Sequence, residues 1–321
     1  MATSRIPAIL IVAGSGPIDR NGNVPGLPGL RLFLNTSNRF ADHMMAPGRV
    51  RDVAVLSYDK RGVGKSLKVG DRNLYHRAGM MDLVRDAVEA VRFLAAHPRI
   101  DTERIVLLGH SEGAIILPLI CRECKADGSE GLVPIRGCIF YSGFGASVEE
   151  AMTAQREQVM DEVRREPGCK GWLLRKVLTE ERIVRQYDDL MAKVNADDNP
   201  DFVSAQCGLV KHPAKWIREH MSFDARAALA DHVTCHCLAV TGQKDVQVRD
   251  EHCLPGAASA MVPNAPSIEA HRPANLTHAL RCLDGPSLIL NVGRDYKRMG
   301  KIPLDPELLK ITDEWCDRIL V

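Results

Sequence analysis

Short, continuous apolar runs alternate with amphipathic segments along most of this chain. The runs at 6–12, 53–57, 104–108, 138–141 and 237–240, with a weaker one at 268–271, predict strands buried on both faces. Between them, residues 80–96 carry apolar side chains at helical spacing and end just before Pro98, which predicts a helix. Alternating strands and helices favour an α/β fold, with a mostly parallel sheet covered by helices.

The alternation stops between about residues 148 and 231. This stretch is charged, and its apolar residues recur at helical spacing, which predicts helices at 148–165, 171–195 and 213–230 and no strand. We interpret it as an all-helical cap, 148–231, inserted into a core made of 1–147 and 232–321. Open α/β sheets bind ligands beyond the carboxyl ends of their strands, so a cap there would cover a site. The alternative is a set of peripheral helices without a role at the site.

The run at 105–108 leads into Gly109-His110-Ser111-Glu112-Gly113, and a second apolar run follows at once. G-x-S-x-G between a strand and a helix is the pattern of a nucleophile held on a sharp turn. Glycine is expected at both ends because the helix must pack closely on the strand it has just left. We expect a positive φ at Ser111, and the alternative is a surface turn with an incidental serine.

A nucleophilic serine needs a base and a group that orients the base. Asp245 lies within a few residues of the end of the strand at 237–240, where a side chain can project over the edge of the sheet. Asp250 and Glu251 come later, and we expect them on the next helix. Asp245 is therefore the candidate acid.

His278 lies in the loop after the last predicted strand and is the candidate base. Its rivals are His271, expected at the end of that strand, and His252, expected on a helix. His110 stands beside the serine, but its position in the turn directs its side chain into the scaffold. We expect it to pack there and not to catalyse.

The developing oxyanion of an acyl transfer also needs hydrogen-bond donors. The backbone NH of Glu112 is one candidate, and the loop at 13–17 supplies the other, because Gly14 and Gly16 free its backbone to turn toward a substrate. Such a loop could also cradle a phosphate. The chain has no G-x-G-x-x-G before a helix and no complete P-loop around Lys65, so nucleotide binding is not expected.

The composition adds several exclusions. The net charge is +1 and no apolar run is long enough to span a bilayer, so neither nucleic acid nor a membrane is an expected partner. The first strand leads directly into a glycine loop without a cleavage site, so we expect a cytoplasmic protein.

We interpret the ten cysteines as free thiols. Cys121 and Cys124 form a CxxC on a predicted helix, where burial explains them better than metal or redox chemistry. Cys235 and Cys237 have no partner pair at zinc spacing, and no metal is expected.

Four segments together resemble the α/β-hydrolase superfamily: 13–22 (AGSGPIDRNG), 58–66 (YDKRGVGKS), 109–113 (GHSEG) and 275–278 (NLTH). Within it, the chain is similar to serine esterases and acyl-aminopeptidase-like hydrolases that share the GSGPxDR and YDKRGxGxS segments. The resemblance implies a Ser111–His278–Asp245 triad and an oxyanion hole formed by the amides of Ser15 and Glu112.

The chain departs from this family in two ways. Many relatives have His where this chain has Ala13. The chain also begins at the strand before the oxyanion loop, so two N-terminal strands of the family are expected to be missing. A sheet edge uncovered in this way would favour association with another copy of the chain.

These observations favour a serine hydrolase that cleaves a small carboxylic ester without a cofactor. Acyl transfer, thioester hydrolysis or aminoacyl-peptide hydrolysis could use the same residues, and a non-catalytic ligand-binding protein is the alternative from another class. Gly14 and Gly16 are expected to contact substrate, and Trp172 and Trp216 of the cap are candidates for the pocket wall. The sequence does not identify the acyl or alcohol group.

Overall fold

Six parallel strands form the central sheet of the computed structural model, which describes residues 5–26, 31–50, 52–68, 71, 73–125, 133–205 and 210–321. Their order is β10-β9-β6-β5-β1-β4, and every neighbouring pair is parallel. The strands are β1 (Ile6–Val12), β4 (Ala54–Ser57), β5 (Ile100–His110), β6 (Ile135–Tyr141), β9 (His236–Val240) and β10 (Ile268–His271). All six predicted strands are therefore confirmed, and β5 and β6 begin several residues earlier than predicted.

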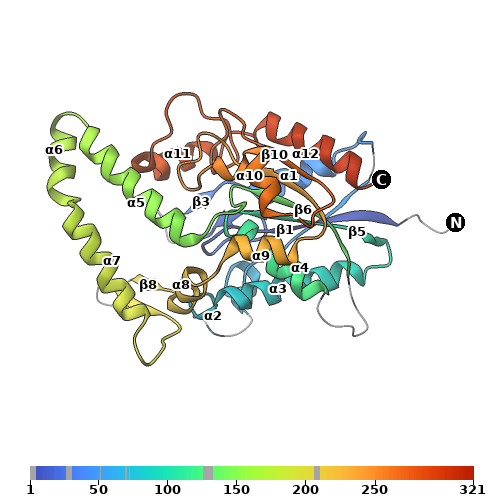
Figure 1. Cartoon of the computed structure of the whole chain (residues 1–321), viewed down its shortest axis with the longest axis horizontal. Helices are drawn as coiled ribbons and strands as arrows, with labels where there is room; N and C mark the ends of the chain where they lie inside the picture. Colours follow the sequence, from blue (N-terminus) through green and yellow to red (C-terminus); the bar gives the residue numbers. More distant parts are fainter. Residues whose placement is uncertain are drawn as a thin grey trace.

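Helices cover both faces of the sheet (Figure 1). One face packs against α1 (Thr36–Met44) and α12 (Pro306–Ile319), whose Phe40 and Trp315 lie in one buried cluster with alternate residues of the central strands. The other face packs against α3 (Met80–Ala95), α4 (Glu112–Lys125), α9 (Ala225–His232) and α10 (Pro255–Met261). The α/β prediction is confirmed: the inner strands β1, β5, β6 and β9 are largely buried on both faces, and the edge strands β4 and β10 are half-buried.

The helix predicted at 80–96 is confirmed as α3. Its buried residues recur at helical spacing, and Asp82 accepts a hydrogen bond from the backbone N–H of Gly79 at its N-terminus. Residue 96 forms its C-cap. The last helix of the chain is α12, where Asp305 caps the first turn.

The segment 148–231 differs in detail from the prediction. Val148–Arg165 is α5, as expected, but 171–195 is two helices, α6 (Gly168–Val177) and α7 (Glu180–Val194), and 213–230 is α8 (Ala214–Met221) and α9. The breaks fall where Thr179 and Asp224 cap new helices with their side chains. The helical period continues across each break, so periodicity alone did not reveal them.

This segment is also not all helical, which corrects the prediction. Two strands of three residues, β7 (Val203–Ala205) and β8 (Val210–His212), form an antiparallel pair within it. Three residues are too few to show the alternation from which a strand is predicted. Helices α5, α6 and α7 form an arm that projects from the sheet, with α6 at its outer end (Figure 1).

The remaining elements are short: β2 (Asn23–Val24), β3 (Leu32–Phe33), α2 (Leu74–Arg77), α11 (Val292–Met299), and 3-10 turns at Gly64–Lys68, Glu251–Cys253 and Ile289–Asn291. Strand β4 lies at one edge of the sheet. Association through this edge stays a prediction. Within the described residues, no helix is both long and apolar enough to cross a bilayer.

Candidate active site

Ser111 lies on a tight turn between the end of β5 and the start of α4, at the carboxyl edge of the sheet. Its φ is 56°, which confirms the expected left-handed conformation. A side chain at Gly109 would place its Cβ 2.5 Å from the backbone nitrogen of Ala114, and one at Gly113 would place it 2.0 Å from the carbonyl oxygen of Val12. Only glycine fits at either end. The close packing of α4 against the strands therefore holds the Ser111 backbone in its conformation.

The structure brings Ser111, His278 and Asp245 together from three separate loops. The hydroxyl of Ser111 lies 3.1 Å from Nε2 of His278, and Nδ1 of His278 lies 2.8 Å from Oδ2 of Asp245. Backbone N–H groups of Gln247 and Val248 donate to the other oxygen of Asp245. Burial raises the pKa of this carboxyl, but the His278 imidazole and the two N–H donors outweigh burial and lower it below its usual value. Asp245 is thus an anion turned toward the imidazole.

The other histidines weighed from the sequence lie elsewhere. His110 lies beside His278, and its Nε2–H donates to the backbone carbonyl of that residue at 2.8 Å. Burial lowers the pKa of His110 to about 3, so it stays neutral and supports the loop. His271 faces Glu269 in β10, and His252 lies against Glu150 and Arg226.

The loop at 13–17 lies directly against the serine. A Cβ added to Gly14 would be 3.1 Å from the Cβ of Ser111, so the loop backbone and the nucleophile are in van der Waals contact. Gly16 has a φ of 95° and open space around it, and the exposed Ser15 lies between the two glycines. The loop is thus adjacent to the place where an oxyanion would form.

Lys60 and Glu112 form a buried ion pair behind this loop, which the sequence analysis missed. The Lys60 ammonium donates to the Glu112 carboxylate at 2.7 Å and to the carbonyl oxygen of Gly14 at 2.5 Å, and both charged side chains are almost fully buried. Burial raises the pKa of Glu112, but Lys60 and His220 outweigh it and lower the pKa well below its usual range. One signal was available: a glutamate inside an apolar helix start requires a buried partner.

Comparisons with known proteins find similarity to hydrolases. Residues 27–171 match the profile of the serine aminopeptidase S33 family. Over 128 residues the chain is 31% identical to Esterase EstD of Thermotoga maritima, a match that covers 40% of this chain and 27% of that protein. The chain therefore spans about a quarter of the length of this curated relative.

Solved structures resemble the whole chain at low identity. The α/β hydrolase GrgF from Penicillium sp. sh18 is 14% identical with a TM-score of 0.51, over 99% of this chain and 92% of that one. A structure from the metagenome-derived lipolytic enzymes LipS and LipT is 13% identical with a TM-score of 0.51, over 98% and 96%. The chain has the α/β-hydrolase fold. The proteins that it resembles in sequence are an esterase and a serine aminopeptidase family.

The two segments that carried the resemblance are bonded to each other. Arg20 lies in the segment 13–22 and Asp59 in the segment 58–66. The Arg20 guanidinium donates to the Asp59 carboxylate at 2.6 Å, and the Arg20 backbone N–H donates to it at 2.7 Å. The backbone N–H of Lys65 donates to the same carboxylate. Burial raises the pKa of Asp59, but these donors outweigh it and lower the pKa to about 2. The pair fixes the glycine loop against the loop that carries Lys60.

Trp216 of α8 reaches the serine turn, and its place in a pocket wall stays a prediction. Its indole N–H donates to the Glu112 carboxylate, and its ring stacks on His220 with centroids 4.1 Å apart. Nε2 of His220 lies 3.2 Å from the same carboxylate, and Nδ1 lies 2.9 Å from the Trp216 carbonyl oxygen. Helix α8 is thus anchored on the residue that follows the serine.

Trp172 does not lie at this site, which corrects the other prediction about the pocket wall. It belongs to α6, which lies at the outer end of the arm (Figure 1). Its side chain is 56% exposed, and the Lys176 ammonium lies 4.0 Å from its ring centroid. Leu173 and Val177 beside it are also about half exposed. These exposed residues of α6 therefore do not face Ser111, because α6 lies at the outer end of the arm, away from the serine turn.

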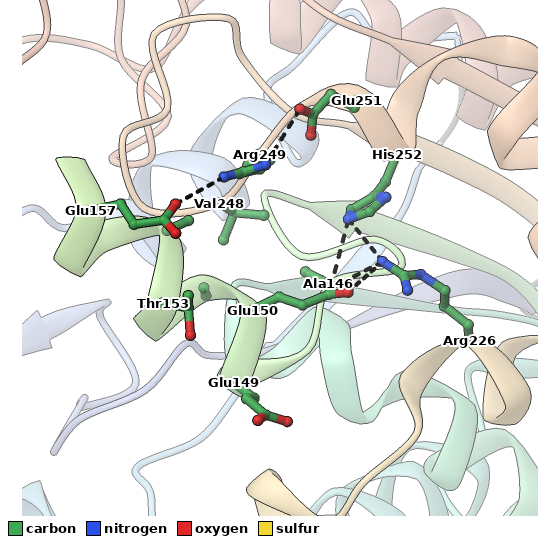
Figure 2. Close-up of a pocket in the computed structure, with 12 residues that line it drawn as sticks. Ala146, Glu149, Glu150, Thr153, Glu157, Arg226, Val248, Arg249, Glu251 and His252 are labelled. Atoms are coloured by element: carbon green, nitrogen blue, oxygen red, sulfur yellow. Dashed lines mark hydrogen bonds and ion pairs between the residues drawn. The ribbon is translucent and has the colours of Figure 1, made fainter. Parts of the chain in front are cut away.

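Helix α5 and the loop after β9 enclose a polar groove of about 440 Å³ (Figure 2). Arg226 bridges Glu150 and His252 on one side, and Arg249 lies between Glu157 and Glu251 on the other. A second hollow of about 370 Å³ shares residues with this groove and continues to the loop that begins with Asp245. The side-chain amide of Gln155 on α5 donates to the carbonyl oxygen of Gln247 in that loop.

Proposed function

We propose that this α/β hydrolase is a serine hydrolase that cleaves a carboxylic ester through an acyl-enzyme. The observation that carries the proposal is the continuous hydrogen-bonded line from the Ser111 hydroxyl through His278 to Asp245. A serine held at positive φ beside a buried imidazole–carboxylate pair has little use in folding, because the strained turn costs about 1–3 kcal/mol.

In the proposed first half-reaction, the Ser111 oxygen attacks the ester carbonyl carbon and Nε2 of His278 takes the hydroxyl proton. Asp245 accepts the hydrogen bond from Nδ1–H and stabilises the imidazolium that forms. When the tetrahedral intermediate collapses, the C–O bond to the alcohol breaks and the imidazolium returns the proton to the leaving oxygen. A water molecule then repeats the sequence on the acyl-serine and releases the acid.

We assign the two oxyanion donors to the backbone N–H groups of Ser15 and Glu112. Their loops flank the Ser111 hydroxyl, and the Lys60 ammonium joins them from behind by bonding Gly14 and the Glu112 side chain. Loss of a single donor typically costs about 2.7–4 kcal/mol of transition-state stabilisation. Gly14 and Gly16 contribute by letting substrate approach the backbone.

We further propose that 148–231 acts as a cap on a core of 1–147 and 232–321. Two contacts support this role: Trp216 bonds the Glu112 carboxylate, and Gln155 bonds the loop that follows Asp245. The groove along α5 provides a route toward that loop for a small ester or acyl substrate.

Aminoacyl-peptide hydrolysis is the second candidate. The family profile carries the name serine aminopeptidase, and the groove contains the Glu149 carboxylate, which suits a substrate ammonium group. Rates on p-nitrophenyl esters of increasing chain length, compared with aminoacyl and thioester substrates, distinguish the candidates.

The decisive experiment substitutes the proposed nucleophile. Ser111→Ala should lower kcat by at least about 10³-fold with the fold intact, and His278→Ala should do the same. The double variant should lose little more, because members of a triad act as a unit. Mass spectrometry should show the acyl group, or a fluorophosphonate label, on Ser111. A folded Ser111→Ala protein with full turnover would refute the proposal.

A further inference from the structure

Three cysteines far apart in the sequence meet in the core beneath the sheet. Cys121 comes from α4, Cys138 from β6, and Cys235 from the turn between α9 and β9. The Sγ atom of Cys138 lies 3.5 Å from that of Cys121 and 3.6 Å from that of Cys235, and all three sulfurs lie within 4.8 Å of one another. All three are free thiols in a buried position.

The spacing of these sulfurs suits a shared ion. Three points with two sides of 3.5 and 3.6 Å and a third side of at most 4.8 Å lie on a circle of radius about 2.0–2.4 Å. A thiolate–metal bond measures about 2.3 Å for zinc, so one ion at the centre would reach all three sulfurs with small side-chain shifts. We propose that Cys121, Cys138 and Cys235 form a site for a soft monovalent cation, Cu(I).

The ligand set favours copper over zinc. Thiolates are soft ligands that select Cu(I) or zinc over magnesium and calcium. Structural zinc is almost always four-coordinate, whereas the group found among the described residues has three members. The nearby Cys237 directs its thiol to the carbonyl oxygen of Cys235 at 3.4 Å, so it steadies that ligand from outside the group.

Binding requires deprotonation, and the surroundings of Cys235 assist it. Each coordinating thiol loses its proton, so a fully thiolate site with one Cu(I) releases three protons and carries a charge of −2. A positive charge lies close to Cys235 along the chain, because the Lys125 ammonium donates to the hydroxyl of the neighbouring Thr234. Lys125 is held nearby by the carbonyl of His232 at 3.0 Å.

Cys235 also provides access. It is 8% exposed, whereas Cys121 and Cys138 are essentially inaccessible, so an ion would first meet the thiol of Cys235. Once bound, the ion would join α4 to β6 and to the start of β9. Because the unfolded chain does not hold the three thiols together, binding should stabilise the fold by a free energy that grows with the logarithm of the affinity.

The test titrates the full-length, fully reduced protein with Cu(I) under anaerobic conditions, in competition with a chromophoric chelator. We expect one high-affinity equivalent, proton release on binding, and a rise in melting temperature. Cys138→Ala and Cys235→Ala should each weaken binding by at least about 100-fold. Cys253→Ala is the matched control, because Cys253 is equally buried but its thiol faces Thr241. This control should bind like the natural chain.

Three results would overturn the proposal. They are the absence of tight stoichiometric Cu(I) binding, equal loss in the Cys253→Ala control, and binding of Zn(II) in preference to Cu(I) at the same residues. Circular dichroism identifies any variant that fails to fold. If Cys138→Ala fails to fold, Cys235→Ala, at the more exposed position, is compared with the Cys253→Ala control instead. Hydrolysis by Ser111 is measured separately, so failure here leaves the proposed function unaffected.

Discussion

Lys60 shows how strongly one side chain can depend on its surroundings. Its ammonium is buried, and it is tolerated there because Glu112 supplies a countercharge and Gly14 a carbonyl oxygen. Removing one partner of such a pair leaves the other as an uncompensated buried charge, which costs about 3–5 kcal/mol. Because its two partners belong to the two loops beside Ser111, Lys60 is a positioning residue for the proposed oxyanion hole.

Lys60→Met should therefore lower kcat by at least about 10-fold while KM changes by less than about threefold, since the oxyanion forms only in the transition state. It should also lower the free energy of unfolding. Adding Glu112→Gln should recover part of that stability, because the unpaired charge is then removed.

The matched control is Lys65→Met, in the same segment but exposed; it should leave both kcat and the melting temperature nearly unchanged. Steady-state kinetics and urea denaturation measure the two effects. A Lys60→Met protein with natural kcat and lower stability would assign Lys60 a purely structural role.

At the scale of elements, the turn between β5 and α4 depends on glycine for close approach. The Cβ of an alanine at 113 would meet the Val12 carbonyl oxygen at 2.0 Å, so β1 and α4 would have to separate. At Gly256, in the first turn of α10, nothing lies within 4 Å of an added Cβ. Placing alanine at each position therefore separates the steric clash at 113 from the general effect of replacing glycine in a helix.

We expect Gly113→Ala to destabilise the protein by more than about 3 kcal/mol or to prevent folding, as severe core overpacking does. Gly256→Ala should stabilise it by about 0.5–1 kcal/mol, because alanine favours the helix. Melting temperatures and urea midpoints measure both. Equal effects of the two substitutions would contradict the close packing at the serine turn.

The bond between Arg20 and Asp59 joins two loops and predicts a pH dependence. The folded pKa of Asp59, about 2, lies below its ordinary value of 3.8, so its carboxylate stabilises the fold. This contribution is complete above about pH 4 and is lost as the pH falls toward 2.

Asp59→Asn should therefore cost about 1–2 kcal/mol at pH 7, a value reduced from the full shift because Arg20 is partly exposed. The difference from the natural chain should shrink as the pH falls from 4 to 2. Urea denaturation at pH 7, 5 and 3 measures it, with the exposed Asp42→Asn as control. A difference that does not vary with pH would indicate that packing, not charge, explains the loss.

At the scale of the whole molecule, the segment 148–231 has two unequal parts. Helix α8 and its Trp216 are anchored to the serine turn, whereas α6 lies at the end of the arm with Trp172 exposed (Figure 1). A role as cap therefore predicts that the two tryptophans differ in their influence on substrate choice.

Trp216→Leu should change the ratio of kcat/KM between long- and short-chain esters by at least about fivefold, because it removes both a ring and a hydrogen bond beside Glu112. Trp216→Phe keeps the ring and should retain more of the natural ratio. Trp172→Leu, the matched control, should alter the ratio by less than twofold. If the two leucine variants behave alike, α8 does not shape the pocket.

Sequence patterns were sufficient for local structure. The six strands, helices α3 and α5, and the strained serine were predictable because strands of a covered parallel sheet are continuously apolar and a tight strand–helix turn must have glycines. Asp245 and His278 were predictable as candidates because parallel strands end at one edge of the sheet. The breaks in 148–231 were not, since a cap residue can start a new helix without changing the apolar period.

Tertiary structure alone decided which distant side chains meet. The sequence contained Lys60, Glu112 and Trp216, but their buried network depends on two loops and a helix that converge on one turn. The same holds for the three thiols of α4, β6 and the start of β9, whose spacing in the chain follows no metal-binding motif. The hydrophobic period of a helix or strand sets its local pattern. The contacts between distant side chains depend on how the elements pack together, and the period of one element carries no information about that packing.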